Sequence, residues 1–277
     1  MTEEKRSVLR RALRILETIK DAADGLSLSE ISRRSGVPLT TTHRIVAELL
    51  AWGALERDDS GEYRIGLWLW EVAAVAPRSV GLQRVAQPFM RDLFETTQRG
   101  VHLAVREKDQ YVFLERLLSP ETATDRAQVG GRYELYATAI GLVLLAYAPP
   151  ELQEKVVTGP LEVPSWHAPV TEHQVRQTLA DVRLHGYATT DIRQEYTSVA
   201  APIHGPGGTV VAALSLILRR NEPYAPRLAH LLATVRGISR ALGAPQARPR
   251  PGVPYDTRVP SVPRSSDMRS SDIRKRG

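Results

Sequence analysis

Hydroxyl, imidazole and guanidinium side chains occur together in one short segment, as Thr40, Thr41, His43 and Arg44. Threonine bonds phosphates or base edges, arginine matches a guanine or a phosphate, and histidine does either more weakly. On a helix that turns roughly 100° per residue, Thr40 and Arg44 share a face with two alanines. The opposite face is predicted to be buried, and its members are Thr42, Ile45, Val46, Leu49 and Leu50. A helix that enters the major groove of DNA needs one face that packs in the protein core and an opposite face of small and hydrogen-bonding side chains that reach the bases.

Further arginines flank the segment: Arg33 and Arg34 precede it, and Arg57 and Arg64 follow it. We expect these four side chains to bind phosphates beside a duplex. The alternative is a solvated surface on which neighbouring carboxylates balance the positive charge. These carboxylates are Glu48, Glu56 and Asp58.

The local pattern predicts the elements that position these residues. Apolar residues at helical spacing predict a first helix from about Val8, which Gly25 ends. Ser27 and Glu30 have the spacing of a capping box, so a short second helix follows. The break at residues 35–38 precedes a third helix, which runs to about residue 52.

Residues 55–57 and 63–65 read as two short strands around an Asp-Asp-Ser-Gly turn. Helix, helix, turn, helix and hairpin is the order of a winged helix-turn-helix. We therefore assign residues 1–66 to a DNA-binding domain.

A second candidate site lies where a glycine-rich loop leads into a helix. Gly130 and Gly131 precede Thr138, which opens an apolar helical segment. Backbone N–H groups at a helix N-terminus favour an anion such as a carboxylate. The alternative is a tight turn with Thr138 as the N-cap. Asp191 and Glu195 precede an apolar strand, and a solvated loop is the alternative for them.

The rest of the chain mixes strands and helices without strict βαβ repetition, so we expect an α+β fold with helices packed on a sheet. Residues 67–79 read as a linker helix, in which we interpret Trp68 and Trp70 as core residues rather than an interaction face. Residues 80–244 form the second domain. Residues 245–277 are rich in Pro, Arg and Ser, so we expect a disordered basic tail.

Composition narrows the function classes. The 277 residues include no cysteine, which excludes thiolate metal sites and cysteine nucleophiles. The net charge of +6 resides mostly in the tail, so it is no evidence that a folded domain binds nucleic acid. The charged N-terminus and the lack of a long apolar run predict no signal peptide, no membrane span and a cytoplasmic protein. We find no metal-ligand spacing, no cofactor motif and no hydrolase or nucleotide-binding motif, so an enzyme is the weaker alternative.

Several motifs in order resemble one family. They are Leu26–Pro38, Thr41–Leu49, Gly53–Arg57, His102–Val105, Gly130–Arg132, Ala137–Gly141, Gly186–Ala188, Ala200–Ile203 and Val211–Ser215. Over about residues 7–243 the chain resembles the IclR-type transcriptional regulators.

This resemblance implies a homodimer, or a dimer of dimers, that binds a double-stranded DNA operator. It also implies a GAF-like C-terminal domain that binds a small-molecule effector, expected to be an organic or aromatic acid. The implied pocket residues are Gly130, Gly131, Arg132, Ala137, Thr138, Asp191, Glu195, Ser198 and Ser215. Position 198 departs from the family pattern, because members of the family often have a cysteine where this chain has Ser198.

Overall fold

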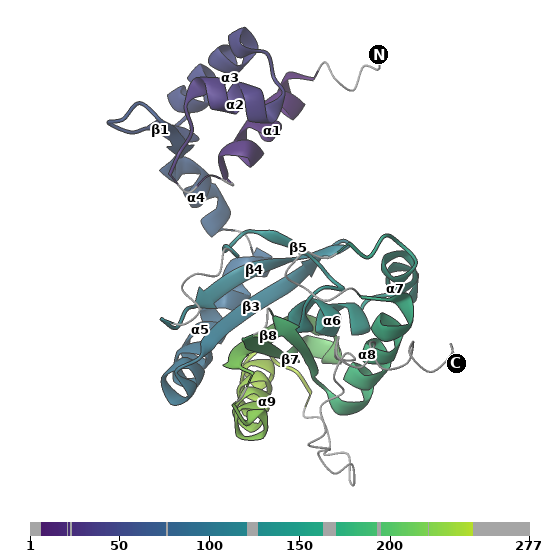
Figure 1. The fold of residues 1–277 in the computed structure, drawn as a ribbon. Coiled ribbons are helices and arrows are strands. Elements are labelled where there is room, and N and C mark those ends of the chain that lie inside the picture. The colour runs from purple at the N-terminus through teal and green to yellow at the C-terminus, as the bar shows by residue number, and fades with distance from the viewer. Residues whose placement is uncertain are drawn as a thin grey trace, which may run out of the picture. The chain divides into compact units, whose positions relative to one another are not determined.

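The structure is a computed structural model that describes residues 7–20, 22, 24–75, 77–120, 127–162, 170–192, 195–220 and 222–245. The predicted tail therefore lies outside the described residues from 246 onward. The chain forms two compact units, Met1–Val80 and Gly81–Gly277 (Figure 1). Within the described residues, no helix is both long and apolar enough to cross a lipid bilayer.

The N-terminal unit has the predicted element order. Its elements are α1 (Val8–Lys20), α2 (Leu28–Ser35), α3 (Leu39–Ala51), β1 (Leu55–Arg57), β2 (Tyr63–Ile65) and α4 (Leu67–Ala74). The two strands pair antiparallel as a wing. The helices and the wing enclose a small apolar core that includes Ile15, Ile31 and Ile45.

Local hydrogen bonds explain why α2 and α3 form where they do. The Oγ of Ser27 accepts from the N–H of Glu30 (3.4 Å), and the Glu30 carboxylate accepts from the N–H of Ser27 (3.1 Å), which completes the predicted capping box. Gly36 ends α2 with a φ of +65°, a conformation that glycine adopts without strain. The buried Thr42 hydroxyl then donates to the carbonyl of Val37 (3.1 Å), which fixes the turn between the helices.

The helix α4 differs from the prediction for its tryptophans. It contains no buried residue, and the exposed fractions of Trp68 and Trp70 are 39% and 66%. The prediction that these two rings are core residues is therefore wrong. The reason is that α4, apart from Glu71, is apolar around its whole circumference, and the unit covers too little of it. The Trp68 ring contacts the ring of Trp52, which is itself 68% exposed, with ring centroids 6.0 Å apart.

The start of α4 is held tightly against the end of α3. The N–H of Gly66 donates to the carbonyl of Ala54 (3.0 Å). A side chain at Gly66 would collide with the carbonyl oxygen of Gly53. Only glycine therefore permits this approach of the two backbone segments.

The C-terminal unit is built on a six-stranded antiparallel sheet with the order β5-β4-β3-β8-β7-β6. The strands are β3 (Gly100–Glu107), β4 (Gln110–Leu117), β5 (Arg132–Glu134), β6 (Ala188–Ile192), β7 (Tyr196–His204) and β8 (Val210–Arg219). The glycine-rich segment 205–208 joins β7 and β8 as a hairpin, in which the N–H of Gly205 donates to the carbonyl of Thr209 (2.8 Å).

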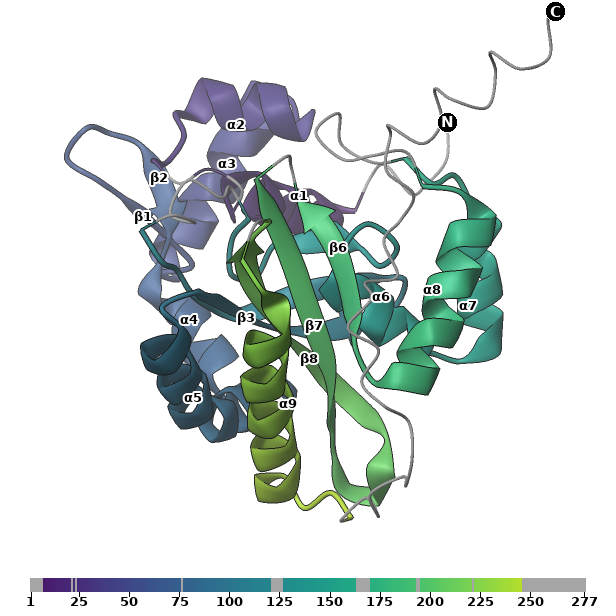
Figure 2. The same ribbon diagram turned by 60° about the horizontal axis from the view of Figure 1, so that its bottom comes forward.

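Helices cover both faces of this sheet (Figure 2). Their bounds are α5 (Pro77–Thr97), α6 (Ala139–Ala146), α7 (Pro150–Val157), α8 (Glu172–His185) and α9 (Tyr224–Ala241). Side chains of α5 and α9 pack on one face, and side chains of α6, α7 and α8 pack on the other. The predicted α+β fold is confirmed. We call the face toward α6 the inner face.

Candidate DNA-binding surface and effector site

The helix α3 exposes the face that the sequence predicts. Thr40, His43 and Arg44 are exposed and Thr41 is half-buried, whereas Thr42, Ile45 and Val46 are buried. The polar side chains of the first turn are thus available to a ligand, while the apolar side chains anchor the helix in the core. This arrangement suits insertion of α3 into a DNA groove.

The arginines around α3 differ in what already binds them. Across the described parts of the chain, neither the Arg44 nor the Arg33 side chain makes an ion pair or a hydrogen bond. Arg34 lies 3.7 Å from the carboxylate of Glu30, one turn earlier on α2, and both side chains are largely exposed. An exposed pair of this kind is weak, so these three arginines remain able to meet phosphates.

The two wing arginines are already bound by neighbouring groups of the N-terminal unit. The Nε of Arg64 lies 2.9 Å from the carboxylate of Asp58, and its Nη2 donates to the carbonyl of Asp24 (3.0 Å). Arg57 donates to the carbonyl of Gly61 (2.9 Å). The Ser60 hydroxyl is the main cause that lowers the pKa of Asp58, so this carboxylate stays charged and holds the turn.

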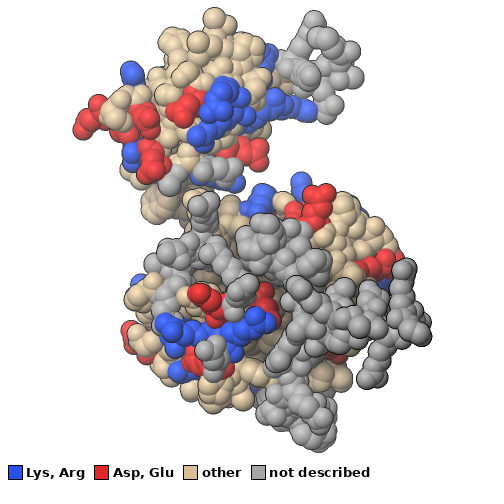
Figure 3. Space-filling model, viewed as in Figure 1, with Lys and Arg blue, Asp and Glu red and all other residues tan. Residues whose placement is uncertain are grey.

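Charge is distributed unevenly over this unit. Figure 3 shows acidic side chains gathered at the wing and basic side chains over α1 and α2. The wing arginines bind groups that hold the hairpin together, whereas Arg33 and Arg34 lie in the last turn of α2. Phosphate contacts are expected mainly from α2 and α3.

In the C-terminal unit, the strand register places polar side chains in a row across the inner face. Arg116 on β4 pairs with His102 on β3, which pairs with Ser215 on β8, which pairs with Ala200 on β7. Directly paired residues on one face have Cβ atoms roughly 5 Å apart. We call Arg116, His102, Ser215 and Ala200 the transverse row.

A second polar pair lies beside the transverse row. Ser198 on β7 pairs with Thr190 on β6, and both side chains are buried. The Thr190 hydroxyl accepts from the N–H of Ala139 (2.9 Å), the first residue of α6. The start of α6 is thus tied to the same face of the sheet. The face as a whole presents hydroxyl, imidazole and guanidinium groups under the helix.

His102 is neutral in this setting. Its side chain is 3% exposed, and burial, with a smaller contribution from the Arg116 guanidinium, lowers its pKa to about 3. Its Nε2 lies 3.5 Å from the Nη2 of Arg116. Both groups pack on Phe113: the His102 ring is edge-on to it at 5.3 Å, and the guanidinium lies 5.4 Å from its centroid. Arg116 is therefore held between an imidazole and an aromatic ring.

The structure places the predicted effector residues in two groups. Ser198 and Ser215 lie on the inner face, and Thr138 joins them through α6, where its hydroxyl caps Gly141 (3.2 Å) and bonds the Tyr111 hydroxyl (3.1 Å). The N-cap alternative for Thr138 is thus observed. Ala137 is half-buried beside it.

The other predicted residues lie away from the transverse row. Gly130 and Arg132 are exposed and Gly131 is half-buried, in the loop that leads into β5. Asp191 pairs with Thr197, on the opposite face from Thr190, and its carboxylate binds Arg220 and the Thr197 hydroxyl. Glu195 is exposed in the turn before β7.

Sequence reasoning missed Arg116, His102 as a site residue, and Thr190. The available signal was the alternation of side chains along a strand, which places residues 102, 104 and 106 on one face. The pairing of β3 with both β4 and β8 is not readable from the sequence, so the transverse row was not predictable.

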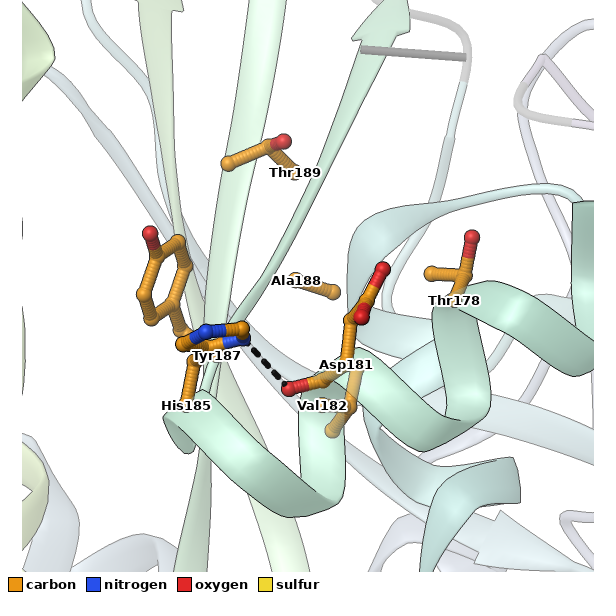
Figure 4. Close-up of a pocket in the computed structure, with 7 residues that line it drawn as sticks. All are labelled: Thr178, Asp181, Val182, His185, Tyr187, Ala188 and Thr189. Carbon is orange, nitrogen blue, oxygen red and sulfur yellow. Dashed lines mark hydrogen bonds between the residues drawn. The ribbon is translucent and has the colours of Figure 1, made fainter. Parts of the chain in front are cut away.

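Two hollows lie elsewhere on this unit. Figure 4 shows one between α8 and β6, where His185 bonds the carbonyl of Asp181 (3.0 Å); at about 10 Å³ it has room for a single water. A groove of about 700 Å³ lies between α9 and the β7–β8 hairpin, and it is lined in part by His204, Arg236 and Arg240. The arginines of this groove are exposed, and burial lowers the pKa of His204.

Within the described ranges, no group of three or more His, Asp or Glu side chains is placed to hold a metal ion.

Comparison with known families decides the identity. The IclR helix-turn-helix domain model matches residues 8–59, and the model for the C-terminal domain of the bacterial transcriptional regulator IclR matches residues 75–244. The chain belongs to the IclR family. It is a DNA-binding transcriptional regulator with an effector-binding C-terminal domain, and the family consists of regulators rather than enzymes.

Individual IclR-family proteins agree with this assignment. HTH-type transcriptional regulator XynR of Escherichia coli K12 is 28% identical over 247 residues, which cover 85% of this chain and 96% of XynR. HTH-type transcriptional regulator BhcR of Paracoccus denitrificans is 30% identical over 75% of this chain and 76% of its own length.

The solved structures agree as well. An IclR homolog from Microbacterium hydrocarbonoxydans, complexed with 4-hydroxybenzoate, has a TM-score of 0.80 and 34% identity, covering 86% of this chain and 99% of that chain. The Thermotoga maritima IclR has a TM-score of 0.67 at 21% identity, covering 85% of this chain and 98% of its own, and supports the fold alone.

Proposed function

We propose that this IclR-family regulator binds a pseudo-palindromic operator as a homodimer, with α3 of each subunit in a major groove. The observation that carries the proposal is the exposed first turn of α3. Thr40, Thr41, His43 and Arg44 are the proposed contacts to base edges and nearby phosphates. Arg33 and Arg34 are the proposed phosphate contacts outside the groove. Arg57 and Arg64 contribute mainly by shaping the wing.

The exposed apolar surface of the N-terminal unit supports a dimer. Leu67, Trp70, Val72 and Val75 of α4 are 61%, 66%, 52% and 80% exposed, and Trp52 beside them is 68% exposed. Several large apolar side chains exposed on one short helix are typical of an interaction site. A pseudo-palindromic operator has two-fold symmetry and matches a two-fold symmetric dimer, so we propose α4 of a second subunit as the partner of this surface. A dimer of dimers is the alternative assembly.

We propose a small organic acid, and among these an aromatic acid, as the effector. The inner face of the sheet offers donors that suit a carboxylate, and the 34% identical homolog is complexed with 4-hydroxybenzoate. The proposed site combines Ser198, Ser215 and Thr138 with the loop 130–137. Asp191 and Glu195 lie at its margin. Such a ligand changes operator affinity only if it binds one dimer arrangement better than another.

The division of labour along the chain is part of the proposal. Residues 1–66 bind DNA, the helix within 67–79 links the domains, and 80–244 bind the effector. Residues 245–277 add positive charge that attracts DNA without sequence preference. We place the protein in the cytoplasm, where a bacterial operator lies.

The test is operator binding by wild-type protein and the Arg44→Ala variant. Fluorescence anisotropy uses a labelled fragment from upstream of the protein's own gene, with and without 4-hydroxybenzoate. Loss of a base-reading arginine is expected to cost about 1–3 kcal/mol of specific binding. Wild-type affinity is expected to change when the acid is added.

The matched control is Arg84→Ala, which removes the same charge from an exposed position on α5. Its operator affinity is expected to equal that of the wild type. Equal affinities of the Arg44→Ala variant and the wild type would remove Arg44 from the contacts. Equal affinities with and without the acid, at saturating acid, would reject this effector.

A further inference from the structure

We propose that Leu39, the first residue of α3, reads a thymine in each operator half-site by packing its side chain on the C5-methyl group of that base. The inference rests on the proposed function, because it requires that α3 enters a major groove. It adds an apolar contact to the hydrogen-bonding side chains of Thr40, His43 and Arg44. Leu39 was not among the residues predicted to touch DNA.

The first argument is the exposure of Leu39. Its side chain is 52% exposed, and it is not among the residues that form or pack on the apolar core of the N-terminal unit. Trp52, which belongs to the apolar surface proposed for the dimer, follows the other end of α3. The helix between them spans about 20 Å at a rise of roughly 1.5 Å per residue. Leu39 is therefore separate from both the core and Trp52, and it continues the face that is proposed to meet DNA.

The second argument is the direction of the side chain. Side chains on a helix lean toward its N-terminus, so the side chain of the first residue projects ahead of the helix. At roughly 100° per residue, Leu39 lies about 40° from His43 around the helix axis, and His43 and Thr40 are both exposed. The N-terminal residues of a recognition helix are those that contact base edges. Leu39 thus lies at the leading end of the proposed contact face.

The third argument is the well-fixed turn that precedes α3. The carbonyl of Val37 accepts hydrogen bonds from the hydroxyls of Ser32 (2.7 Å) and Thr42 (3.1 Å). The ring of Pro38 holds its φ at −54°. The backbone on both sides of Leu39 is therefore fixed before DNA binds. A side chain carried on such a backbone costs less ordering on binding, so its contact contributes more to affinity.

The fourth argument is chemistry. A leucine side chain neither donates nor accepts hydrogen bonds, so it cannot read the polar atoms of a base edge. The apolar group that base edges present in the major groove is the C5-methyl group of thymine. Cytosine carries only a hydrogen at that position. Removing one methyl-sized group from water favours thymine by about 4-fold in affinity.

The methyl group of Thr40 is the competing apolar contact, because Thr40 is exposed next to Leu39. A threonine methyl group also packs on thymine in protein–DNA complexes. It is smaller than a leucine side chain, and the Thr40 hydroxyl is proposed to bond a base edge or a phosphate. The variant Thr40→Ser removes this methyl group and keeps the hydroxyl, so it separates the two contacts.

The experiment measures operator binding by the full chain in fluorescence anisotropy. The operator is a duplex that the wild type selects from random-sequence DNA. Each thymine is replaced in turn by deoxyuridine, in both half-sites together, which removes the methyl group and keeps base pairing. At one thymine position, the wild type is expected to lose about 4-fold in affinity per half-site, or about 15-fold in all.

The variants are Leu39→Ala and Thr40→Ser. The matched control is Leu184→Ala, which shortens a leucine that is 57% exposed on α8. Leu39→Ala is expected to bind the thymine and the deoxyuridine duplexes equally at the sensitive position. Thr40→Ser and Leu184→Ala are expected to keep the wild-type loss there.

Four outcomes overturn the inference. A wild type that is insensitive to every deoxyuridine replacement makes no methyl contact, and this result needs no variant to fold. A Leu39→Ala variant that keeps the full wild-type loss assigns the methyl contact to another side chain. A Thr40→Ser variant that abolishes the loss assigns it to Thr40. A changed oligomeric state of Leu39→Ala in analytical ultracentrifugation places Leu39 in a contact between subunits.

Failure of this inference differs from failure of the proposed function. A wild type that selects no sequence from random DNA refutes the proposed operator binding itself. A selected operator whose binding is weakened by Arg44→Ala, but by no deoxyuridine replacement, refutes the role of Leu39 alone.

Discussion

The buried, neutral His102 is expected to make the effector domain less stable as the pH falls. Burial lowers the pKa of His102 from 6.5 to about 3, so the folded protein holds this imidazole neutral while the unfolded chain takes up a proton. Stability is therefore unaffected above pH 6.5 and declines between pH 6.5 and about 3. One pH unit is worth about 1.4 kcal/mol. Between pH 7 and pH 5, His102 alone is expected to remove about 2 kcal/mol.

The assay is urea unfolding at pH 7, 6 and 5, followed by far-ultraviolet circular dichroism. Hydrogen exchange of the β3 amides reports on the effector unit itself. The variant His102→Gln keeps a polar side chain but cannot titrate, so its loss of stability between pH 7 and pH 5 is expected to be about 2 kcal/mol smaller than that of the wild type.

The control is His230→Gln, which removes an exposed histidine from α9. This variant is expected to keep the full pH dependence of the wild type. The reasoning is refuted if His102→Gln also keeps that full dependence, because the proton uptake would then belong to another group.

Three further predictions concern the DNA-binding unit and the tail. Arg33→Ala is expected to weaken operator and non-operator DNA alike and to reduce the slope of log K against log salt by about 1, measured by anisotropy between 50 and 200 mM salt; an unchanged slope would exclude a phosphate contact. Ser27→Ala removes the α2 cap and is expected to cost about 1 kcal/mol in urea unfolding, and a cost near zero would show that the cap is dispensable. Truncation after Ala244 is expected to leave the melting temperature intact and to lower non-specific DNA affinity at low salt; a truncated chain that does not fold would contradict the predicted disorder of the tail.

The N-terminal unit was almost fully predictable because its signals are local. The capping pair Ser27 and Glu30, the break at Gly36 and the turn at 58–61 each act over a few residues, and the structure places the two wing strands at the predicted residues. The alternation of polar and apolar residues along α3 also sufficed to identify its exposed face.

Elements that depend on distant contacts were harder to predict. The strand β5 has only three residues, and its pairing with β4 defines it. The helix α7 was not predicted; it opens at Pro150, and proline is well tolerated in the first turn of a helix. The polar groups of the inner face come from strands that meet only after folding, so Ser198 and Ser215 were predicted without the Thr190 and His102 side chains that their strand pairing places beside them.

The glycine contact at Gly66 bears on how a signal travels inside this regulator. No side chain fits between Gly66 and Gly53, so the backbone at the start of α4 is in direct contact with the backbone that follows α3. We expect a rotation of α4 to be passed on to α3, the helix proposed to contact DNA, because the backbone segments next to the two helices touch directly at Gly66 and Gly53. The flexible segment that permits movement is then expected beyond residue 75. A bulkier residue at position 66 is expected to change the orientation of α4 relative to α3 rather than its mobility.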